Sequence, residues 1–168
     1  MHQGRAAAVS PPSARGRRRS FVSAGVLALA LTACAAPPLD PDGSLDRITE
    51  SGLLRAGASP SGELVIIDDP GPSGALVDLV DGFAEQYGAR VSWHVDSEED
   101  LVQGLADGRL DVVVGGMTTS SPWTDLASVT RGYPAIAGSE GADVAFLLPL
   151  GENGLQAALE TYLDEETR

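Results

Sequence analysis

The chain has 168 residues and a formal net charge of −13 at pH 7, with 24 acidic residues against 11 basic ones. A surface this acidic repels phosphate backbones, so the composition argues against nucleic acid as a partner. Cys34 is the only cysteine, which excludes a disulfide within one chain.

The first 33 residues have the parts of an export signal. Basic residues at 15–19 precede an apolar run over 21–31, which is shorter than the roughly 20 residues that span a bilayer. The sequence Leu-Thr-Ala-Cys follows directly and resembles a bacterial lipobox. That resemblance implies cleavage before Cys34 and acylation of its thiol, for example with palmitate. The alternative for Cys34 is an ordinary small residue in a membrane-like stretch. The twin-arginine-like stretch at 18–23 leaves Sec and Tat export both open.

We therefore expect a lipoprotein signal peptide over 1–33, a flexible Pro-rich tether over 34–43, and one domain over 44–168. The part after the signal has six Arg, no Lys and all 24 acidic residues, a net charge of −18. Such a chain does not hold anionic lipid by charge. A lipid on Cys34 would instead anchor it at the extracytoplasmic face of the cell membrane.

The first half of the domain alternates helices with strands. Ser44 is placed to cap a short helix that Gly52 ends. A strand is expected over 53–59, followed by a short extended piece over 63–69 and a turn. Gly88 is expected at the C′ position of a second helix. The apolar residues of that helix have the i, i+3, i+4, i+7 spacing of a helix lying on a core; they are Leu76, Leu79, Val80 and Phe83.

The second half continues the alternation. A strand is expected over 89–95, and Ser97 with Asp100 resembles a capping box for a helix ending near Gly108. The remaining elements are expected as a continuous apolar strand at 110–116, a strand at 142–150 and a helix at 153–165. The order predicts an α/β fold with a mostly parallel sheet flanked by helices.

The end of the strand at 110–116 is the best candidate for a ligand site, because ligands of open α/β sheets bind beyond the carboxyl ends of the strands. Gly115 and Gly116 allow close approach, and residues 118–121 supply hydroxyl groups. If a helix starts at Pro122, its N–H groups would add donors. Ser59, at the end of the first strand, would lie beside them. The equal alternative is that the glycines shape a turn and the hydroxyls cap that helix.

Four stretches resemble, in order, the family 3 extracellular solute-binding proteins, which are the amino-acid-binding components of ABC importers. They are SLDRITESGLLRAG (44–57), GALVDLVDGFAEQYG (74–88), ADGRLDVVVGGMT (106–118) and GENGLQAALETYL (151–163). The resemblance implies a periplasmic-binding-protein-like lobe. Our hypothesis is a solute site at the strand tips in which Ser59, Gly116, Met117, Thr118 and Thr119 contact the solute and Trp123 stacks on it.

Two departures from this family matter. The family places an Arg a few residues after Gly-Met-Thr, where it binds the α-carboxylate of the ligand. Here Trp123 stands at that place, or Thr124 if one residue is inserted, and neither side chain neutralises a carboxylate. A cationic or neutral ligand is therefore easier to reconcile with the chain than an anionic one. In addition, residues 130–141 stand where a whole second lobe of roughly 100 residues would be inserted, which predicts a single lobe.

We expect no cofactor, no metal site and no catalysis. The domain has one His, His94, which lies in a strand pattern, and no motif brings a Ser to it. Trp93 is expected in the core, whereas Tyr133 fits a cleft rim or a cover for the sheet equally well. The resulting hypothesis is a lipid-anchored solute-binding protein of ABC-transporter type, with a small solute and a membrane permease as partners. The alternative is a non-enzymatic interaction module that docks on a membrane transporter or sensor.

Overall fold

The computed structural model describes residues 40–168. The expected signal peptide, the lipidation site Cys34 and most of the expected tether lie outside the described residues. Within the described part, no helix has the length and apolar character needed to cross a membrane.

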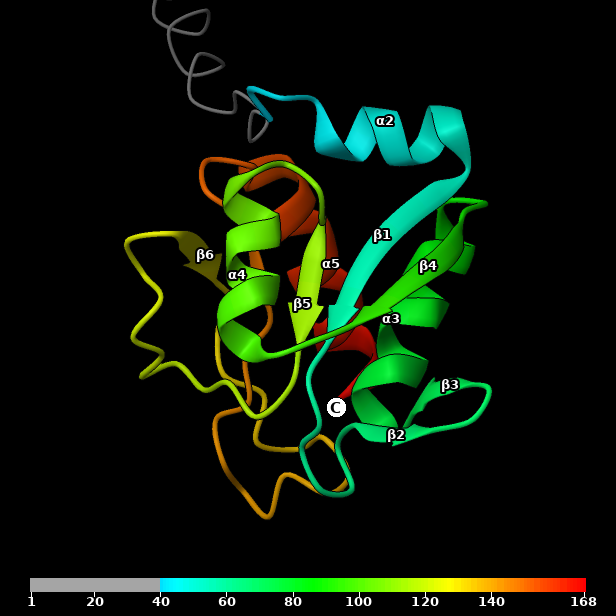
Figure 1. Cartoon of the computed structure of the whole chain (residues 1–168). Helices are drawn as coiled ribbons and strands as arrows, with labels where there is room; N and C mark the ends of the chain where they lie inside the picture. The colour runs from blue at the N-terminus through cyan, green and yellow to red at the C-terminus, as the bar shows by residue number, and fades with distance from the viewer. Residues whose placement is uncertain (1–39) are drawn as a thin grey trace, which may run out of the picture. The chain divides into compact units, whose positions relative to one another are not determined.

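A five-stranded sheet in the order β4-β1-β5-β7-β6 forms the centre of the lobe (Figure 1). β1 (Leu53–Ala58) pairs in parallel with β4 (Arg90–Val95) on one side and with β5 (Val112–Val114) on the other. β7 (Leu147–Pro149) runs antiparallel to β5, and β6 (Ala127–Val129) runs antiparallel to β7. Four of the five strands therefore point the same way, as the alternating sequence pattern predicted.

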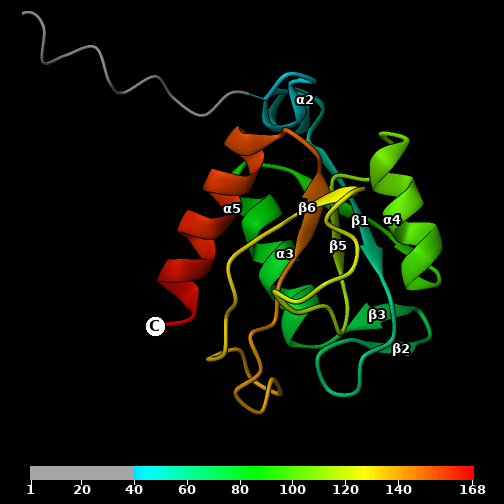
Figure 2. The same cartoon turned by 90° about the vertical axis from the view of Figure 1, so that its left-hand side faces the viewer.

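Helices cover both faces of this sheet. α3 (Ala75–Gln86) and α5 (Asn153–Glu166) lie on one face, and α4 (Glu98–Ala106) lies on the other (Figure 2). α2 (Ser44–Ser51) crosses the end at which β1 begins (Figure 1). The expected α/β fold, with a mostly parallel sheet flanked by helices, is confirmed.

Two hydrophobic clusters hold the layers together. The first cluster joins α2, α3 and α5 to the sheet and contains Phe83, Phe146 and Leu159. The second cluster joins α4 to the opposite face and contains Leu101, Val113 and Leu147. Successive β5 residues alternate between the two clusters, because neighbouring side chains of a strand point to opposite faces. The apolar run at 110–116 thus belongs to a strand that is buried on both faces.

The residues expected at the helix ends behave as predicted, with one exception. Gly52 and Gly88 adopt the left-handed conformation, with φ of 63° and 66°, at the ends of α2 and α3. Ser97 is the N-cap of α4, and its hydroxyl accepts a hydrogen bond from the Asp100 amide at 3.2 Å. Ser44 was expected to cap α2 but does not. Gly43 takes the N-cap position, and Ser44 is buried with its amide bonded to Glu152.

The structure contains two strand features that the sequence pattern did not predict. The extended piece expected over 63–69 is half of a hairpin, in which β2 (Ile66–Asp68) pairs with β3 (Gly71–Ser73). β6 is a three-residue strand that pairs, among the described strands, with β7 alone, and three residues are too few to give a recognisable strand pattern. The last strand is shorter than expected, because only Leu147–Pro149 pair as a regular strand.

Candidate solute-binding site

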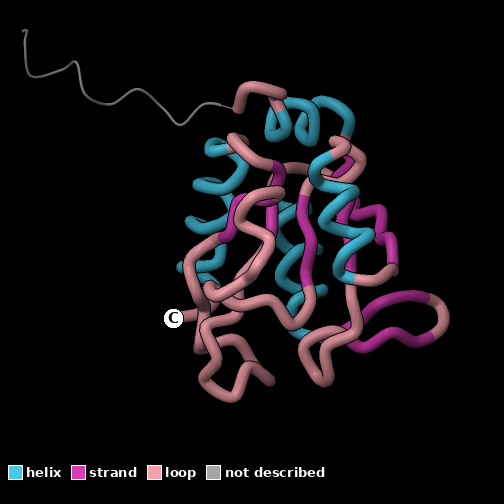
Figure 3. The backbone as a smooth tube through the Cα atoms, turned by 60° about the vertical axis from the view of Figure 1, so that its left-hand side comes forward, coloured by secondary structure: helices cyan, strands magenta, loops and turns pink. Residues whose placement is uncertain are grey.

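The carboxyl ends of β4, β1 and β5 lie side by side at one end of the sheet. Ala58 pairs with Val95 on one side and with Val114 on the other. We call the residues that follow these three strands, 59–63, 96–98 and 115–123, the strand-tip rim. Loops gather at this end of the lobe (Figure 3), opposite the end that α2 crosses (Figure 1).

Ser59 has the most informative environment in the strand-tip rim. It follows β1 directly, is 6% exposed, and extends the sheet by donating its amide to the Val114 carbonyl at 3.0 Å. Its hydroxyl bonds to no group among the described residues. No fully buried side-chain polar atom in the described part lacks a partner, so the Ser59 hydroxyl oxygen keeps some contact with solvent. A nearly buried hydroxyl without a protein partner is a group that a bound solute can satisfy.

Glycine at position 115 allows the Ser59 hydroxyl to lie against the tip of β5. A Cβ atom at Gly115 would be 2.1 Å from Ser59 Oγ, which is too close for two non-bonded atoms. At Gly116, a Cβ would lie 3.0 Å from Ser61 Oγ. The space beside both glycines is therefore taken by the chain's own serines, and close approach of a ligand stays a prediction. Among the described groups, none accepts from the backbone N–H of Gly116 or Met117.

The remaining predicted residues differ in what they offer. The Met117 side chain is 3% exposed and packs in the second cluster, while its carbonyl accepts from Ala145 at 3.0 Å. Met117 can therefore meet a solute only through its backbone N–H. Thr118 is half-buried, and its carbonyl accepts from the Ser121 amide at 2.9 Å. Thr119 is exposed, and its amide donates to the Asp143 carbonyl at 3.2 Å.

No helix begins at Pro122, because residues 122–126 form turns that lead into β6. The hydroxyls at 118–121 bond within these turns. Thr118 Oγ1 accepts from the Ser120 amide at 3.4 Å, and Ser121 Oγ accepts from the Trp123 amide at 3.3 Å. The alternative that these hydroxyls cap a helix is therefore wrong, because there is no helix there to cap, and a helix N-terminus adds no donors at this place.

Trp123 joins the strand-tip rim to the start of α4. Its half-buried side chain packs against the second cluster, and its indole Nε1–H donates to Glu98 Oε1 at 2.5 Å. Glu98 is the first residue of α4 and is half-buried. It forms no ion pair with any described residue. The sequence placed Trp123 near the rim, but gave no sign of this carboxylate partner 25 residues away.

The strand-tip rim contains carboxylates and no cationic side chain. Glu63, Asp96 and Glu98 belong to it. The hydrogen bonds of the arginines lie elsewhere: Arg47 and Arg55 both bond to Asp111, which precedes β5 at the opposite strand end. Arg109 bonds to Asp107, and Arg131 to Glu160 and Asp164 of α5. None of these arginines therefore bonds to a rim carboxylate, whereas Asp96 of the rim lies 3.5 Å from the imidazole of His94.

Tyr133 covers the sheet and does not line a cleft. It is buried with Ile136 in the first cluster, and its ring meets Phe146 edge-on at 6.3 Å between centroids. Burial raises the pKa of Tyr133, although its hydrogen bond with Arg131 opposes that shift. The short crossover at 130–143 is therefore folded onto the lobe, in the place where the resemblance would insert a second lobe.

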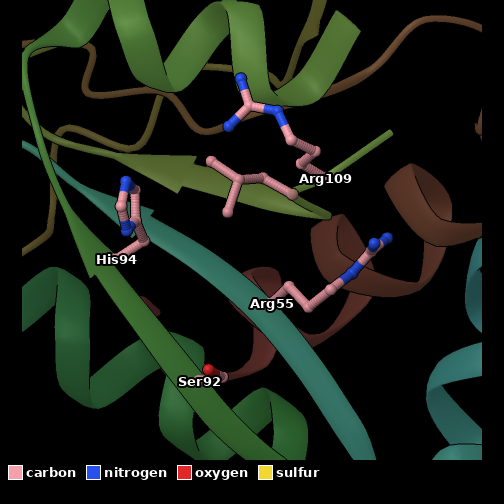
Figure 4. Close-up of a pocket in the computed structure, with 5 residues that line it drawn as sticks. Arg55, Ser92, His94 and Arg109 are labelled. Carbon is pink, nitrogen blue, oxygen red and sulfur yellow. The ribbon is translucent and has the colours of Figure 1, made fainter. Parts of the chain in front are cut away.

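A hollow of about 280 Å³ lies away from the strand-tip rim, on the face of β1 and β4 (Figure 4). It is lined by Arg55, Ser92, His94, Arg109 and Leu110. Carboxylates already pair with its two arginines, because Asp111 bonds to Arg55 and Asp107 bonds to Arg109. Asp96 also lies 3.5 Å from the imidazole of His94.

Trp93 packs against the first cluster as expected, and its indole donates to Asp81 at 3.1 Å. Burial raises the pKa of Asp81, and this indole bond opposes the shift. Trp93 is therefore a core residue with a satisfied polar atom. Within residues 40–168, no group of three His, Cys, Asp or Glu side chains is arranged to hold a metal ion.

No protein-family model matches the chain, and no curated protein matches it. Solved structures do. The arginine-bound domain 1 of TmArgBP from T. maritima matches with a TM-score of 0.63 and 23% identity, covering 71% of this chain and 98% of that one. The Phe-to-Trp mutant of the same domain matches with a TM-score of 0.64, 22% identity, and 73% and 97% coverage.

A third solved structure is the ancestral amino-acid-binding protein AncCDT-1, described as a precursor of cyclohexadienyl dehydratase. It matches with a TM-score of 0.61 and 14% identity, covering 72% of this chain and 92% of that one. At these identities the likeness concerns the fold. The described chain has the fold of one lobe of an amino-acid solute-binding protein.

Proposed function

We propose that this protein is a non-enzymatic solute-binding lobe that takes a small solute at its strand-tip rim. The observation that carries the proposal is the Ser59 hydroxyl, which is almost buried at the tip of β1 and bonds to no described group. It lies against Gly115, next to the N–H groups of Gly116 and Met117, which donate to no described group. Together these donors offer hydrogen bonds that residues 40–168 do not use.

The similar structures support a site in a single lobe. The matched TmArgBP structures are isolated first domains, and each is described as arginine-bound. A solute held by one lobe is less enclosed than a solute between two lobes, since binding pockets usually cover most of a ligand's surface. We therefore expect modest affinity and rapid exchange for this protein.

We further propose that the lobe is lipid-anchored through Cys34 at the extracytoplasmic face and serves an ABC-type permease. These steps rest on the lipobox-like sequence and on the family resemblance. Labelling with radioactive palmitate should mark the full chain and should be lost in Cys34→Ser. Retention of the label in that variant would exclude Cys34 as the acylated residue.

An enzymatic role has weaker support. AncCDT-1 is described as a precursor of an enzyme, so the fold alone does not decide the matter. General acid–base catalysis requires a titratable group within hydrogen-bond reach of the reacting atoms. His94 lies on β4, is 58% exposed at its side chain, and faces the hollow of Figure 4. We therefore place the function of the lobe in binding.

Thermal-shift screening of the described domain against amino acids, polyamines and sugars tests the proposal. A genuine solute should raise the melting temperature, and Ser59→Ala or Thr118→Ala should reduce that rise without lowering the melting temperature of the free protein. Asp40→Ala is the control for folding, because Asp40 caps α5 outside the rim, so its loss should cost stability without reducing the rise caused by the solute.

The second candidate function is an interaction module that docks on a membrane transporter or sensor. The exposed Gly116 and Thr119, with half-buried Trp123, would then form a protein-binding face. If no solute raises the melting temperature, while the same face cross-links to a membrane protein, solute binding is excluded and the interaction module is the better account.

A further inference from the structure

We propose that Glu98 determines the specificity of the strand-tip rim, and that the solute is a small organic cation. This inference rests on the proposed function and names the ligand class of the same site. Trp123 stands where the resemblance leads one to expect an arginine, and its indole is bonded to Glu98. The charge at that place is therefore opposite to the charge that an amino-acid carboxylate requires.

Glu98 is the half-buried carboxylate of the strand-tip rim. One of its oxygens accepts from the Trp123 indole at 2.5 Å, and the other has no partner among the described residues. The start of α4 offsets part of this negative charge, since helix N-termini attract anions. The helix N-terminus attracts the exposed neighbour Glu99 as well as Glu98. Of these two residues, only Glu98 bonds to the Trp123 indole.

The pairing of an indole with a carboxylate suits a cation. The face of a Trp ring attracts ammonium and guanidinium groups, and an unneutralised carboxylate adds a direct charge interaction. Ser59 and the free backbone N–H groups, by contrast, can donate to an oxygen of the same solute. The rim thus combines a cation-attracting side with a hydrogen-bonding side, and offers no arginine for an α-carboxylate.

The acidic surface of the chain does not by itself lead to this inference. Solvated carboxylates occur all over the lobe, for example at Asp78, Glu85 and Asp125. The decisive observations are local: Glu98 touches Trp123, Ser59 keeps an unused hydroxyl at the same sheet edge, and no described arginine bonds to the rim. The sequence alone does not show which carboxylate lies beside Trp123, whereas the fold shows that it is Glu98.

The test uses calorimetric titration of the described domain with four probes: arginine, agmatine, glutamate and glucose. Agmatine has the guanidinium and amine of the cationic class but no carboxylate. We expect arginine and agmatine to bind and the other two not to. Raising the ionic strength should weaken the binding of both cations, because salt screens the attraction.

Two isosteric variants separate specific contact from general charge. Glu98→Gln keeps an oxygen that accepts from the Trp123 indole but removes the charge, and should lower agmatine affinity at least tenfold. Glu99→Gln removes the same charge from the same helix turn without touching Trp123, and should change the affinity less than twofold. Intrinsic fluorescence of a Trp93→Phe background, in which Trp123 is the one remaining indole, should respond to agmatine.

The results of these titrations test three claims separately: the role of Glu98, the cationic class of the solute, and solute binding at the rim. Equal losses in the Glu98 and Glu99 variants would overturn Glu98 as the specificity residue. Binding of glucose or glutamate that Ser59→Ala weakens, without binding of either cation, would overturn the cation inference and leave solute binding at the rim intact. Failure of every solute in the wider screen would remove the proposed function as well.

Discussion

Asp40 precedes α2 but caps α5, whereas Glu152 precedes α5 but caps α2. Asp40 Oδ1 accepts from the Gly154 and Leu155 amides at the start of α5, at 2.6 and 3.0 Å. The Glu152 carboxylate accepts from the Asp42 and Ser44 amides at the start of α2, at 2.9 and 2.8 Å. This reciprocal clasp ties the beginning of the described chain to its last helix.

Removing the Asp40 half of the clasp should destabilise the lobe. Asp40→Ala leaves the first N–H groups of α5 without their acceptor, and loss of such a cap costs about 1–2 kcal/mol. Urea unfolding followed by circular dichroism measures this difference. Asp42→Ala is the matched control, because the Asp42 side chain is exposed and bonds to no described group. Equal effects of the two variants would contradict a specific role for the Asp40 carboxylate.

The Glu152 half of the clasp should make stability depend on pH. Burial opposes ionisation of Glu152, which is 1% exposed, but amide and hydroxyl donors of Asp42 and Ser44 outweigh it and hold its pKa below the ordinary value. A pKa lowered by folding stabilises the protein above the ordinary value, and this stabilisation is lost as the pH falls through the lowered pKa.

Glu152→Gln should therefore be less stable than the wild type at neutral pH, by about 1–3 kcal/mol, the usual strength of hydrogen bonds to a charged group. The gap should narrow in acid, below the ordinary pKa of a glutamate. Urea midpoints across the acidic range measure both effects. A gap that stays constant down to full protonation would show that the charge of Glu152 contributes nothing.

Asp111 is the most consequential buried carboxylate. It is 0% exposed, its oxygens accept from Arg47 and Arg55 side chains at 2.5 Å, and it also accepts from the Arg55 amide at 2.8 Å. Asp111→Asn breaks this arrangement, and loss of one partner of a buried ion pair costs about 3 kcal/mol or more. Chemical denaturation should show the loss. Asp107→Asn, which removes an exposed carboxylate beside Arg109, should leave the midpoint unchanged.

Gly74 should not tolerate a side chain. It precedes α3 with φ of 114°, and a Cβ there would lie 2.8 Å from the Leu64 carbonyl oxygen. Gly74→Ala should lower stability by about 2 kcal/mol, since strained backbone positions cost roughly 1–3 kcal/mol each. Gly71→Ala is the control, because a Cβ atom at Gly71 would have no neighbour within 4 Å and the φ of Gly71 is not positive. Differential scanning calorimetry distinguishes the two variants.

Local patterns predicted the helices well, because their information lies within a few residues. The apolar spacing at Leu76, Val80 and Phe83 gave α3, and the left-handed Gly52 and Gly88 ended α2 and α3. The Ser44 cap was mispredicted because a distant residue, Glu152, supplies the acceptor instead. β6 has three residues, and its pairing with β7 lies outside any local pattern.

The sequence predicted that Ser59 and the glycines after β5 lie together, but not the contacts of the residues around them, and solute binding there stays a prediction. The rule for open α/β sheets brought Ser59 to the glycines after β5, and the structure places them in contact. The burial of Met117 and the bond between Trp123 and Glu98 depend on how α4 packs, which the sequence around each residue does not encode. Tyr133 was left open for a similar reason, because its neighbour Phe146 is distant in the chain.

The folded crossover also constrains how this lobe could acquire a second one. Tyr133 and Ile136 sit within the first cluster, and a domain spliced in at that point would pull both side chains out of it. Deleting one large core side chain typically costs about 2–5 kcal/mol, a sizeable share of the roughly 5–15 kcal/mol that keeps a domain folded. A bilobal form with its second lobe inserted here would therefore need other side chains to cover the sheet in place of Tyr133 and Ile136.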